Sequence, residues 1–398
     1  MGCGRHYKGA MQILFIGFNM PYYGNFRRSS EFARQLARAG HSVTLLTTSA
    51  AQRRHIVERD FFGIRLVETP ALFSGPVRSG WDPWGILARL AWLRGRRFDL
   101  VHAFECRPTV IYPALYAARK AAPLFVDWAD WFGQGGSVEE RPNPVLRNLL
   151  RPVETFYENH FRPQARGNTT ICSTLTAKAL QLGIPAEQIA QIPDGCNPQT
   201  IYPADRLAAR QRLGLPADGP YVGYLGAAFR NDLAFMVDAW QALQAIEPRA
   251  RFLWFGAKSS RDREAFRPFQ NAHIFGRFPQ EQINDFLAAI DAGWLPMRNS
   301  PANRGRWPSK INEYLSAGRP VVSTSLSDLG ELFEKWNIGV LAPEDPAEFA
   351  RSTAALLQEP DLQNQMGAVA RHLAENELSW QSLSRTLLEP FYYKRLSV

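Results

Sequence analysis

The segment "RWPSKINEYLSAGRPVV", residues 306–322, carries the signals of a short helix followed by a buried strand. Pro308 suits the first helical position, because its missing N–H would be unpaired there, and Gly318 suits the position that ends a helix. The apolar residues between them repeat at helical spacing, and "RPVVST" predicts a strand opened by Pro320. We therefore expect a helix that leads directly into a buried strand.

Lys310 stands in the first turn of this predicted helix. There the helix dipole and the unpaired N–H groups present roughly half a positive charge, so a cation is badly placed unless an anion joins it. A phosphate or diphosphate would resolve the conflict. Glu313 lies about 4.5 Å further along the axis on the same face, where a carboxylate could hold sugar hydroxyls. A solvated Lys/Glu pair on a surface helix is the alternative.

Length and composition predict an ordinary globular protein. A chain of 398 residues can form two domains, each with its own core. No apolar run approaches the roughly 18 residues needed to cross a bilayer, and the first residues lack the features of a signal peptide. The four cysteines are far apart and show no metal-type spacing. We expect a cytoplasmic location, reduced thiols and no metal site.

The net charge of +9 is unevenly distributed along the chain. Residues 1–200 hold 24 Lys+Arg against 15 Asp+Glu, whereas residues 201–398 hold 22 of each. Such a first half could face an anionic membrane or a phosphorylated acceptor, and nothing in it resembles a nucleic-acid module. The segment "WDPWGILARLAWLRGRR", residues 81–97, could be an interfacial helix at the inner face of the membrane, or an amphipathic helix with its Trp residues in the core.

Strand and helix patterns alternate in both halves of the sequence. In the first half, "MQILFIGFN", "HSVTLLTT", "FDLVHAF" and "APLFVDWAD" predict strands, and "SSEFARQLARAG" predicts a helix; the second half repeats the scheme. We predict an α/β protein with two doubly wound, Rossmann-like domains, residues 1–200 and 201–380. The tail, about residues 380–398, is expected to pack back on the first domain. A ligand cleft should lie between the domains, at the carboxyl ends of the strands.

Several segments together resemble the retaining family-four glycosyltransferases with the GT-B fold. They are "VHAF", "ICSTLTAKALQLGIPAEQIAQIPDGCNPQTIYP", "HIFGRFPQEQINDFLAAIDAGWLPM" and "PSKINEYLSAGRPVVST", and the similarity runs over most of the chain from about Met11. The resemblance implies that the C-terminal domain binds a nucleoside-diphosphate sugar of the UDP or GDP type, as a substrate and with no cofactor. The N-terminal domain would bind the acceptor.

By this resemblance, Lys310 and the helix start hold the donor diphosphate, and Glu313 holds the ribose hydroxyls. Gly24 in "PYYGN" corresponds to a glycine loop that approaches the diphosphate, where the missing Cβ permits close contact. The loop around Phe278 matches the region that cradles the base. The implied donor contacts are Gly24, Phe278, Arg306, Ser309, Lys310, Ile311 and Glu313.

The sequence departs from the family pattern at two positions. Gly305 stands where the family commonly has a second glutamate, and Tyr224 stands where it often has an arginine. Arg230 falls at the place of a lysine that contacts the diphosphate in relatives, so one cation is kept in this loop. Arg306, next to Gly305, could bind phosphate as a bidentate donor or could be solvated surface charge.

The segment "FVDWADWFGQGG" begins at the end of a predicted strand and supplies the candidates for the acceptor side. Asp127, Trp128 and Trp131 are the expected acceptor contacts, although the aromatic rings could equally pack in the core. Asp130 is the candidate general base or orienter of the acceptor hydroxyl. A capping or turn-forming aspartate is the alternative for this residue.

Together these features predict an enzyme, a glycosyltransferase that moves a sugar to a hydroxyl of a glycan, lipid-linked or small-molecule acceptor with retention of configuration. Its catalytic residues would be Asp130, Lys310 and Arg230. A nucleotide-sugar epimerase of GT-B-like fold and a non-catalytic nucleotide-sugar-binding protein remain as alternatives. An NAD-dependent dehydrogenase is disfavoured, because the first strand runs into "GFNMPYYGN" instead of GxGxxG.

Overall fold

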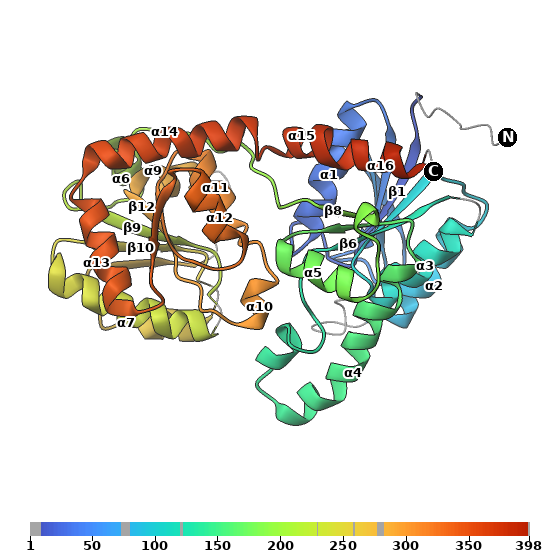
Figure 1. Ribbon diagram of the computed structural model, residues 1–398, viewed down its shortest axis with the longest axis horizontal. Coiled ribbons are helices and arrows are strands. Elements are labelled where there is room, and N and C mark those ends of the chain that lie inside the picture. The colour runs from blue at the N-terminus through green and yellow to red at the C-terminus, as the bar shows by residue number, and fades with distance from the viewer. Residues whose placement is uncertain are drawn as a thin grey trace. The chain divides into compact units, whose positions relative to one another are not determined.

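The computed structural model describes residues 9–72, 80–119, 122–228, 230–257, 259–276 and 282–396, without the side chains of Arg230 and Asn231. The chain divides into two compact units. The first comprises Met1–Pro193, Gly305–Trp307 and Trp380–Val398, and the second comprises Asp194–Arg304 and Pro308–Ser379. Each unit is an α/β layer structure built on its own sheet, as Figure 1 shows. The predicted pair of Rossmann-like domains is confirmed.

The first unit is built on an eight-stranded sheet in the order β3-β4-β2-β1-β5-β6-β7-β8. All of its strand pairs are parallel except the β3–β4 hairpin. β1 and β5 at the centre are apolar and buried, as expected of strands covered on both faces. The strands are β1 (Gln12–Ile16), β2 (Ser42–Thr48), β3 (Val57–Phe61), β4 (Ile64–Thr69), β5 (Leu100–Phe104), β6 (Leu124–Trp128), β7 (Gly167–Thr170) and β8 (Ile189–Gln191).

Helices connect these strands and also return to the unit from the end of the chain. The connecting helices are α1 (Phe26–Arg38), α2 (Pro83–Leu93), α3 (Pro108–Ala118), α4 (Pro144–His160) and α5 (Ser173–Gln181). The last segment contains α15 (Trp380–Leu383), a π-helical turn (Ser384–Leu388) and α16 (Glu389–Leu396).

Residues of α16 pack against the strands of the first unit. The Tyr392 hydroxyl lies 2.5 Å from Nδ1 of His102 on β5, and the ring of Phe391 meets that of Phe125 on β6 edge-on at 5.7 Å. Burial lowers the pKa of His102 to about 4, so this imidazole is neutral at physiological pH. His102 therefore joins the C-terminal segment to the sheet.

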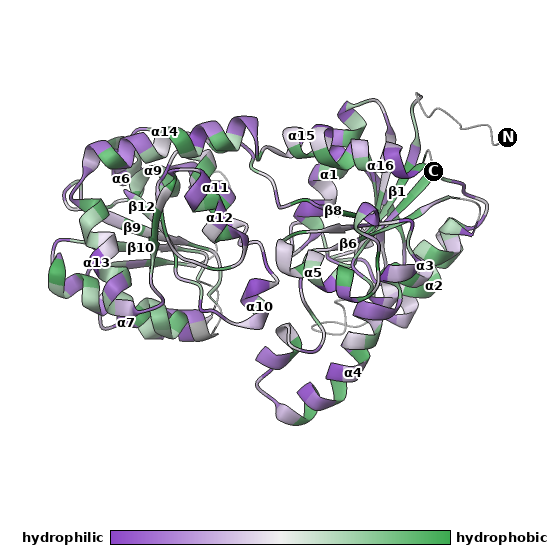
Figure 2. Cartoon of the chain, in the orientation of Figure 1, coloured by the Kyte–Doolittle hydropathy of each residue, from purple (hydrophilic) through white to green (hydrophobic). Residues whose placement is uncertain are grey.

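The second unit is built on a six-stranded parallel sheet in the order β11-β10-β9-β12-β13-β14. Figure 2 shows hydrophobic and hydrophilic stretches alternating along the helices of both units. The strands are β9 (Tyr221–Leu225), β10 (Arg251–Phe255), β11 (Ala272–Phe275), β12 (Ala292–Leu295), β13 (Val321–Thr324) and β14 (Gly339–Ala342). The helices are α6 (Arg206–Arg212), α7 (Arg230–Ile246), α8 (Ser260–Phe266), α9 (Ile283–Ala289), α10 (Pro301–Arg304), α11 (Lys310–Ser316), α12 (Asp328–Lys335), α13 (Pro346–Leu357) and α14 (Pro360–Asn376).

The helix and strand predicted from residues 306–322 are confirmed as α11 and β13. Tyr314, on the buried face of α11, donates its hydroxyl to the carbonyl of Gly223 at 3.1 Å and accepts the N–H of Leu225 at 3.0 Å. Both partners belong to β9, so the tyrosine fastens α11 to the central strand of the sheet. This contact fixes where the start of the helix, and therefore Lys310, lies.

Candidate active site

Lys310 and Tyr224 form the centre of the candidate donor site in the second unit. The Lys310 ammonium donates to the Tyr224 hydroxyl at 2.5 Å and lies 3.8 Å from the centroid of the tyrosine ring. A phenol holds the ammonium in place without neutralising it, unlike a carboxylate. Tyr224 stands where the family often has an arginine. Its neutral hydroxyl holds the Lys310 ammonium in position and leaves the positive charge of Lys310 available to a ligand.

The charge on Lys310 is sensitive to its surroundings. Burial lowers the pKa of the Lys310 ammonium to about 8, and the nearby carboxylates of Asp232 and Glu313 partly oppose this shift. Asp232 is itself fixed, because it accepts the N–H of Arg298 at 3.0 Å and the side-chain amide of Asn303 at 3.2 Å. A lysine in this environment is charged at neutral pH and gains stabilisation when an anion approaches it.

The first turn of α11 uses part of its own hydrogen-bonding capacity. The N–H of Ile311 bonds to the carbonyl of Pro308 at 2.9 Å, and the N–H of Asn312 bonds to that of Ser309 at 3.1 Å. The Ile311 side chain is fully buried. The Ile311 side chain therefore lies in the core and its N–H is already bonded, and the donor contact at Ile311 stays a prediction. Ser309 is exposed at the helix start.

Glu313 and Gly24 stay as predicted donor contacts. Glu313 is buried on α11, one turn after Lys310. Gly24, in the first unit, has φ +49°, and a Cβ there would lie 2.6 Å from the side-chain nitrogen of Asn19. Asn19 also accepts the N–H of Asn25 at 3.1 Å, which holds its side chain against Gly24 and leaves no space there for a larger residue. Phe278 and the side chain of Arg230 lie outside the described residues.

Asp127, at the end of β6, does not reach an acceptor. Its carboxylate is buried and receives two hydrogen bonds from Arg28 on α1, at 2.9 and 3.0 Å, and one from the Thr169 hydroxyl. Burial alone would raise the pKa of Asp127, but the Arg28 guanidinium and the hydrogen bonds outweigh it and hold the pKa below its usual value. The acceptor-binding prediction for Asp127 is wrong, because both oxygens are committed to holding α1 and β7 against β6.

Trp128 is likewise inside the first unit. Its ring is fully buried, with the Arg162 guanidinium 4.1 Å from the ring centroid, and its Nε1 donates to Glu158 at 3.1 Å. The predicted acceptor contact is therefore wrong, and core packing, the alternative left open by the sequence, describes this residue.

Asp130 and Trp131 are partly exposed, whereas Asp127 and Trp128 are buried. The Trp131 indole donates to the carbonyl of Gln134 at 2.9 Å, and the Lys178 ammonium lies 4.1 Å from its ring centroid. These two positions remain the candidates for orienting and stacking on an acceptor.

Glu105 shapes the backbone of this loop and was not identified from the sequence. It follows β5, has φ +75° and is buried. Its carboxylate accepts the N–H groups of Ala129 and Asp130 at 2.7 and 3.2 Å and pairs with Arg162 at 2.9 Å. Burial raises the pKa of Glu105, and Arg162 opposes that rise. The strained backbone of a non-glycine residue at a strand end is the structural sign of this role, and it leaves no sequence signature.

Arg306 and Gly305 are grouped with the first unit. Arg306 pairs with Glu140 at 2.8 Å and lies 4.0 Å from Asp130. A Cβ at Gly305 would lie 2.7 Å from the Cβ of Trp131. The glutamate that the family commonly has at this place would therefore not fit beside Trp131, and a phosphate contact by Arg306 would compete with its carboxylate partners.

Helix α2 lies within the segment 81–97, for which the sequence left two alternatives, an interfacial helix and an amphipathic helix with its Trp residues in the core. Trp92 and Leu93 of α2 are buried, and Arg89 is fully buried with hydrogen bonds to Thr48, Thr69 and the carbonyl of Thr109. Trp92, Leu93 and Arg89 therefore pack inside the first unit, whereas Trp84 and Leu87 on the other side of α2 are exposed.

The described ranges of the chain hold neither a cluster suited to a metal ion nor a membrane-spanning helix. No three His, Cys, Asp or Glu side chains gather there in a way that could hold a metal ion. Over the same ranges, no helix combines the length and the apolar character needed to span a membrane.

Comparison with known proteins identifies the family. The model "Glycosyl transferase 4-like domain" matches residues 26–195, and the model "Glycosyl transferases group 1" matches residues 219–359. The putative teichuronic acid biosynthesis glycosyltransferase TuaH of Bacillus subtilis is 24% identical over 160 residues, 39% of this chain and 40% of that protein. The D-inositol 3-phosphate glycosyltransferase of Thermobispora bispora is 26% identical over 224 residues, 52% of this chain and 51% of that protein.

These matches span about half, or less, of the two curated relatives. A solved structure of HepE from Anabaena, in complex with UDP and glucose, has the same fold over nearly the whole chain. It covers 96% of this chain and 99% of its own, with a TM-score of 0.68 at 15% identity. The two family models and this fold agree with the segments that carried the resemblance, and the chain belongs to the family-four glycosyltransferases with the GT-B fold.

Proposed function

We propose that this glycosyltransferase moves a sugar from a nucleoside-diphosphate donor of the UDP or GDP type to a hydroxyl, with retention of the anomeric configuration. The observation that carries the proposal is the Lys310 ammonium, held by the neutral Tyr224 hydroxyl at 2.5 Å beside the buried Glu313. A directed cation next to a buried carboxylate suits a ligand with an anionic diphosphate and a hydroxyl-bearing ribose.

In this proposal the main work of the second unit is electrostatic. When the bond between the sugar and the diphosphate breaks, negative charge builds on the leaving diphosphate, and Lys310 stabilises it. A preorganised contact of this kind contributes on the order of 3 kcal/mol to the transition state. Arg230 at the start of α7 and Ser309 at the start of α11 are proposed as additional donor contacts, and Glu313 is proposed to hold the ribose hydroxyls.

Retention is proposed to follow from attack on the same face that the diphosphate leaves. The departing diphosphate then helps to remove the proton of the acceptor hydroxyl, and this proton ends on a phosphate oxygen. Asp130, partly exposed on a loop that Glu105 fixes, would orient the hydroxyl, and Trp131 would stack on the acceptor.

The acceptor is proposed to be an anionic glycan or lipid-linked compound. The names of the two relatives described above refer to anionic compounds, teichuronic acid and an inositol phosphate. The excess of positive charge in residues 1–200 suits such an acceptor and also suits a peripheral location at the inner face of an anionic membrane.

A thermal-shift screen tests the donor proposal. Wild-type protein and Lys310→Ala are heated with UDP-, GDP- and ADP-sugars, because a ligand that binds the folded state raises the melting temperature according to its affinity. We expect one nucleotide class to stabilise the wild type and to stabilise the variant much less. Lys335→Ala, an exposed lysine on α12, is the matched control and should respond as the wild type does. Equal shifts in wild type and Lys310→Ala would contradict the assignment.

A further inference from the structure

Helix α4 has its apolar face toward solvent. With 3.6 residues per turn, five apolar residues of α4 fall within an arc of about 100° on one side of the helix. All five are exposed, with relative exposures between 38% and 76%: Val145, Leu146, Leu149, Val153 and Phe156. An ordinary surface helix has the opposite arrangement, with its apolar stripe toward the core. In Figure 1 this helix lies at the edge of the first unit.

The opposite side of α4 is anchored to the protein through charges. The buried Glu154 pairs with Arg141 at 2.6 Å and with Arg107 at 3.4 Å. The buried Glu158 accepts the N–H groups of Phe132 and Gly133 at 2.8 and 3.0 Å, in addition to the Trp128 indole. Rotating the helix to bury its apolar face would leave both buried carboxylates without these donors, which is a large cost. The exposed apolar face is therefore a fixed feature of the unit.

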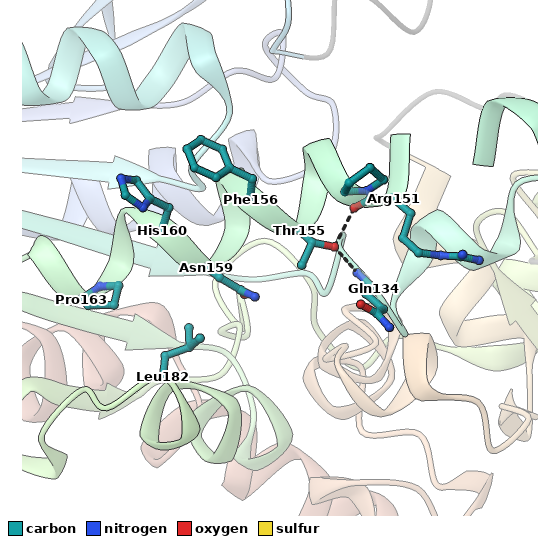
Figure 3. Close-up of a pocket in the computed structure, with 9 residues that line it drawn as sticks. Gln134, Arg151, Thr155, Phe156, Asn159, His160, Pro163 and Leu182 are labelled. Atoms are coloured by element: carbon teal, nitrogen blue, oxygen red, sulfur yellow. Dashed lines mark hydrogen bonds between the residues drawn. The ribbon is translucent and has the colours of Figure 1, made fainter. Parts of the chain in front are cut away.

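The exposed face continues into a shallow hollow beside the C-terminal half of α4. Figure 3 shows the side chains that line this hollow, whose volume is about 750 Å³. Phe156 and His160 stack at its rim, with ring centroids 4.8 Å apart, and Pro163 and Leu182 extend the apolar lining beyond the helix. The apolar surface is thus broader than one helix face.

We propose that the exposed face of α4, defined by the five residues above, is the surface through which the enzyme docks on an anionic membrane. This inference rests on the peripheral location proposed above and names its site. An apolar helix face of this kind inserts about 5–10 Å into the boundary between headgroups and acyl chains. Because both acidic residues of α4 are buried on its inner side, they do not oppose an anionic surface.

Charge favours a membrane over a second copy of the chain as the occupant. The net charge is +9, and all of the excess lies in residues 1–200, the half that contains α4. Two copies meeting through this face would bring like charges together, whereas an anionic bilayer attracts the same half.

The experiment compares vesicle binding by the wild type and by the triple variant Leu149→Gln, Val153→Gln, Phe156→Gln. The matched control is Trp84→Gln with Leu87→Gln, two comparably exposed apolar residues on α2 of the same unit. Proteins are co-sedimented with phosphatidylcholine vesicles that contain no phosphatidylglycerol or about 30 per cent of it. Salt is set at about 0.1 M and about 1 M, where the Debye length is about 10 and about 3 Å. Circular dichroism melting verifies that each variant is folded, and light scattering gives the oligomeric state.

We expect the wild type and the α2 control to bind anionic vesicles at low salt, and the triple variant to lose binding by about tenfold or more, because it withdraws apolar area from the interface. Wild-type binding that the triple variant leaves unchanged would overturn the role of α4 but leave the peripheral location standing. Failure of the wild type to bind any vesicle would overturn both, while the donor thermal shifts, measured without lipid, would still test the transferase. A wild-type dimer that the triple variant converts to a monomer, without vesicle binding, would identify a second copy as the occupant and overturn the proposal.

Discussion

Lys310 in the second unit and Asp130 in the first are positioned in different ways. The position of Lys310 follows from its own short segment, in which Pro308 starts the turn and Tyr314 ties the helix to β9. The backbone of Asp130 is set by Glu105, and Glu105 is held by Arg162, which is 57 residues away along the chain. The helix that carries Lys310 is thus encoded locally, although its partner Tyr224 lies 86 residues away along the chain. On the acceptor side even the backbone of Asp130 depends on buried charges from distant parts of the sequence.

The largest effect on stability should come from breaking the buried Glu105–Arg162 pair, which holds the backbone of Asp130. We expect Arg162→Met to lower the free energy of unfolding by about 3–5 kcal/mol, because it leaves the Glu105 carboxylate buried without its cation. In a domain of this size each kcal/mol lowers the melting temperature by about 2–4 °C. The double variant Glu105→Gln, Arg162→Met removes both charges and should recover much of the loss. A single variant within about 1 kcal/mol of wild type would mean that the pair does not hold the loop.

The next effect tests the donor side, where we expect chemistry to change and stability to stay. Lys310→Ala should raise the donor KM and lower kcat, reducing kcat/KM by about 100-fold, since it removes a charge that stabilises the leaving diphosphate. Glu313→Gln should chiefly weaken nucleoside binding. Steady-state kinetics with the donor found by the thermal-shift screen measures both. Unchanged kinetics in the two variants would contradict the donor assignment. A large loss of stability in Lys310→Ala would contradict the expectation that the donor-side change affects chemistry and not folding.

A smaller effect is expected from pH. The pKa of Lys310 is lowered to about 8, so the residue is charged below that pH and loses its charge as the pH rises through about 8. Donor affinity should therefore weaken above about pH 8, by at most about tenfold per pH unit for a single proton. Calorimetric titration of the donor from about pH 6 to about pH 10 measures this, with Lys310→Arg as the control because arginine keeps its charge. If the donor affinity of the wild type does not change through this pH range, other cations and not Lys310 bind the diphosphate.

The smallest effect is expected from chelation. Lys310 and the proposed Arg230 contact supply positive charge to the diphosphate, so enzyme treated with EDTA should keep most of its transfer rate. The rate is measured before and after treatment, with Mg²⁺ or Mn²⁺ added back. Complete loss that the metal restores would show that the leaving group depends on an ion and not on these side chains alone.

Local signals made much of the fold predictable. Pro308 and Gly318 bound α11, and the apolar strands β1, β5 and β6 lie within the segments predicted as strands. In α1 the helix begins at Phe26, before the serines that the sequence suggested as its start. Periodicity and turn residues act within a few positions, and that is why these elements could be recognised.

The misassigned and missed residues share a different cause. Asp127 and Trp128 have residue types suited to binding, but Arg28 and Glu158 enclose them from other elements. Nothing near residue 127 in the sequence indicates that an arginine 99 positions earlier will occupy its carboxylate. The exposed apolar face of α4 could not be predicted for the same reason. A helical pattern shows which residues form the apolar stripe, but ion pairs with distant residues decide whether that stripe faces the core or the solvent.

The return of the C-terminal segment to the first unit has a consequence for biosynthesis. Tyr392 and Phe391 complete the surroundings of His102 and Phe125, yet they leave the ribosome only after the whole second unit has been made. At about 5–20 residues per second, residues 194–379 delay that arrival by roughly 10–40 s. The domain that is translated first is therefore the last to be finished, and during this interval its strands β5 and β6 wait for packing partners that a co-translational chaperone could temporarily replace.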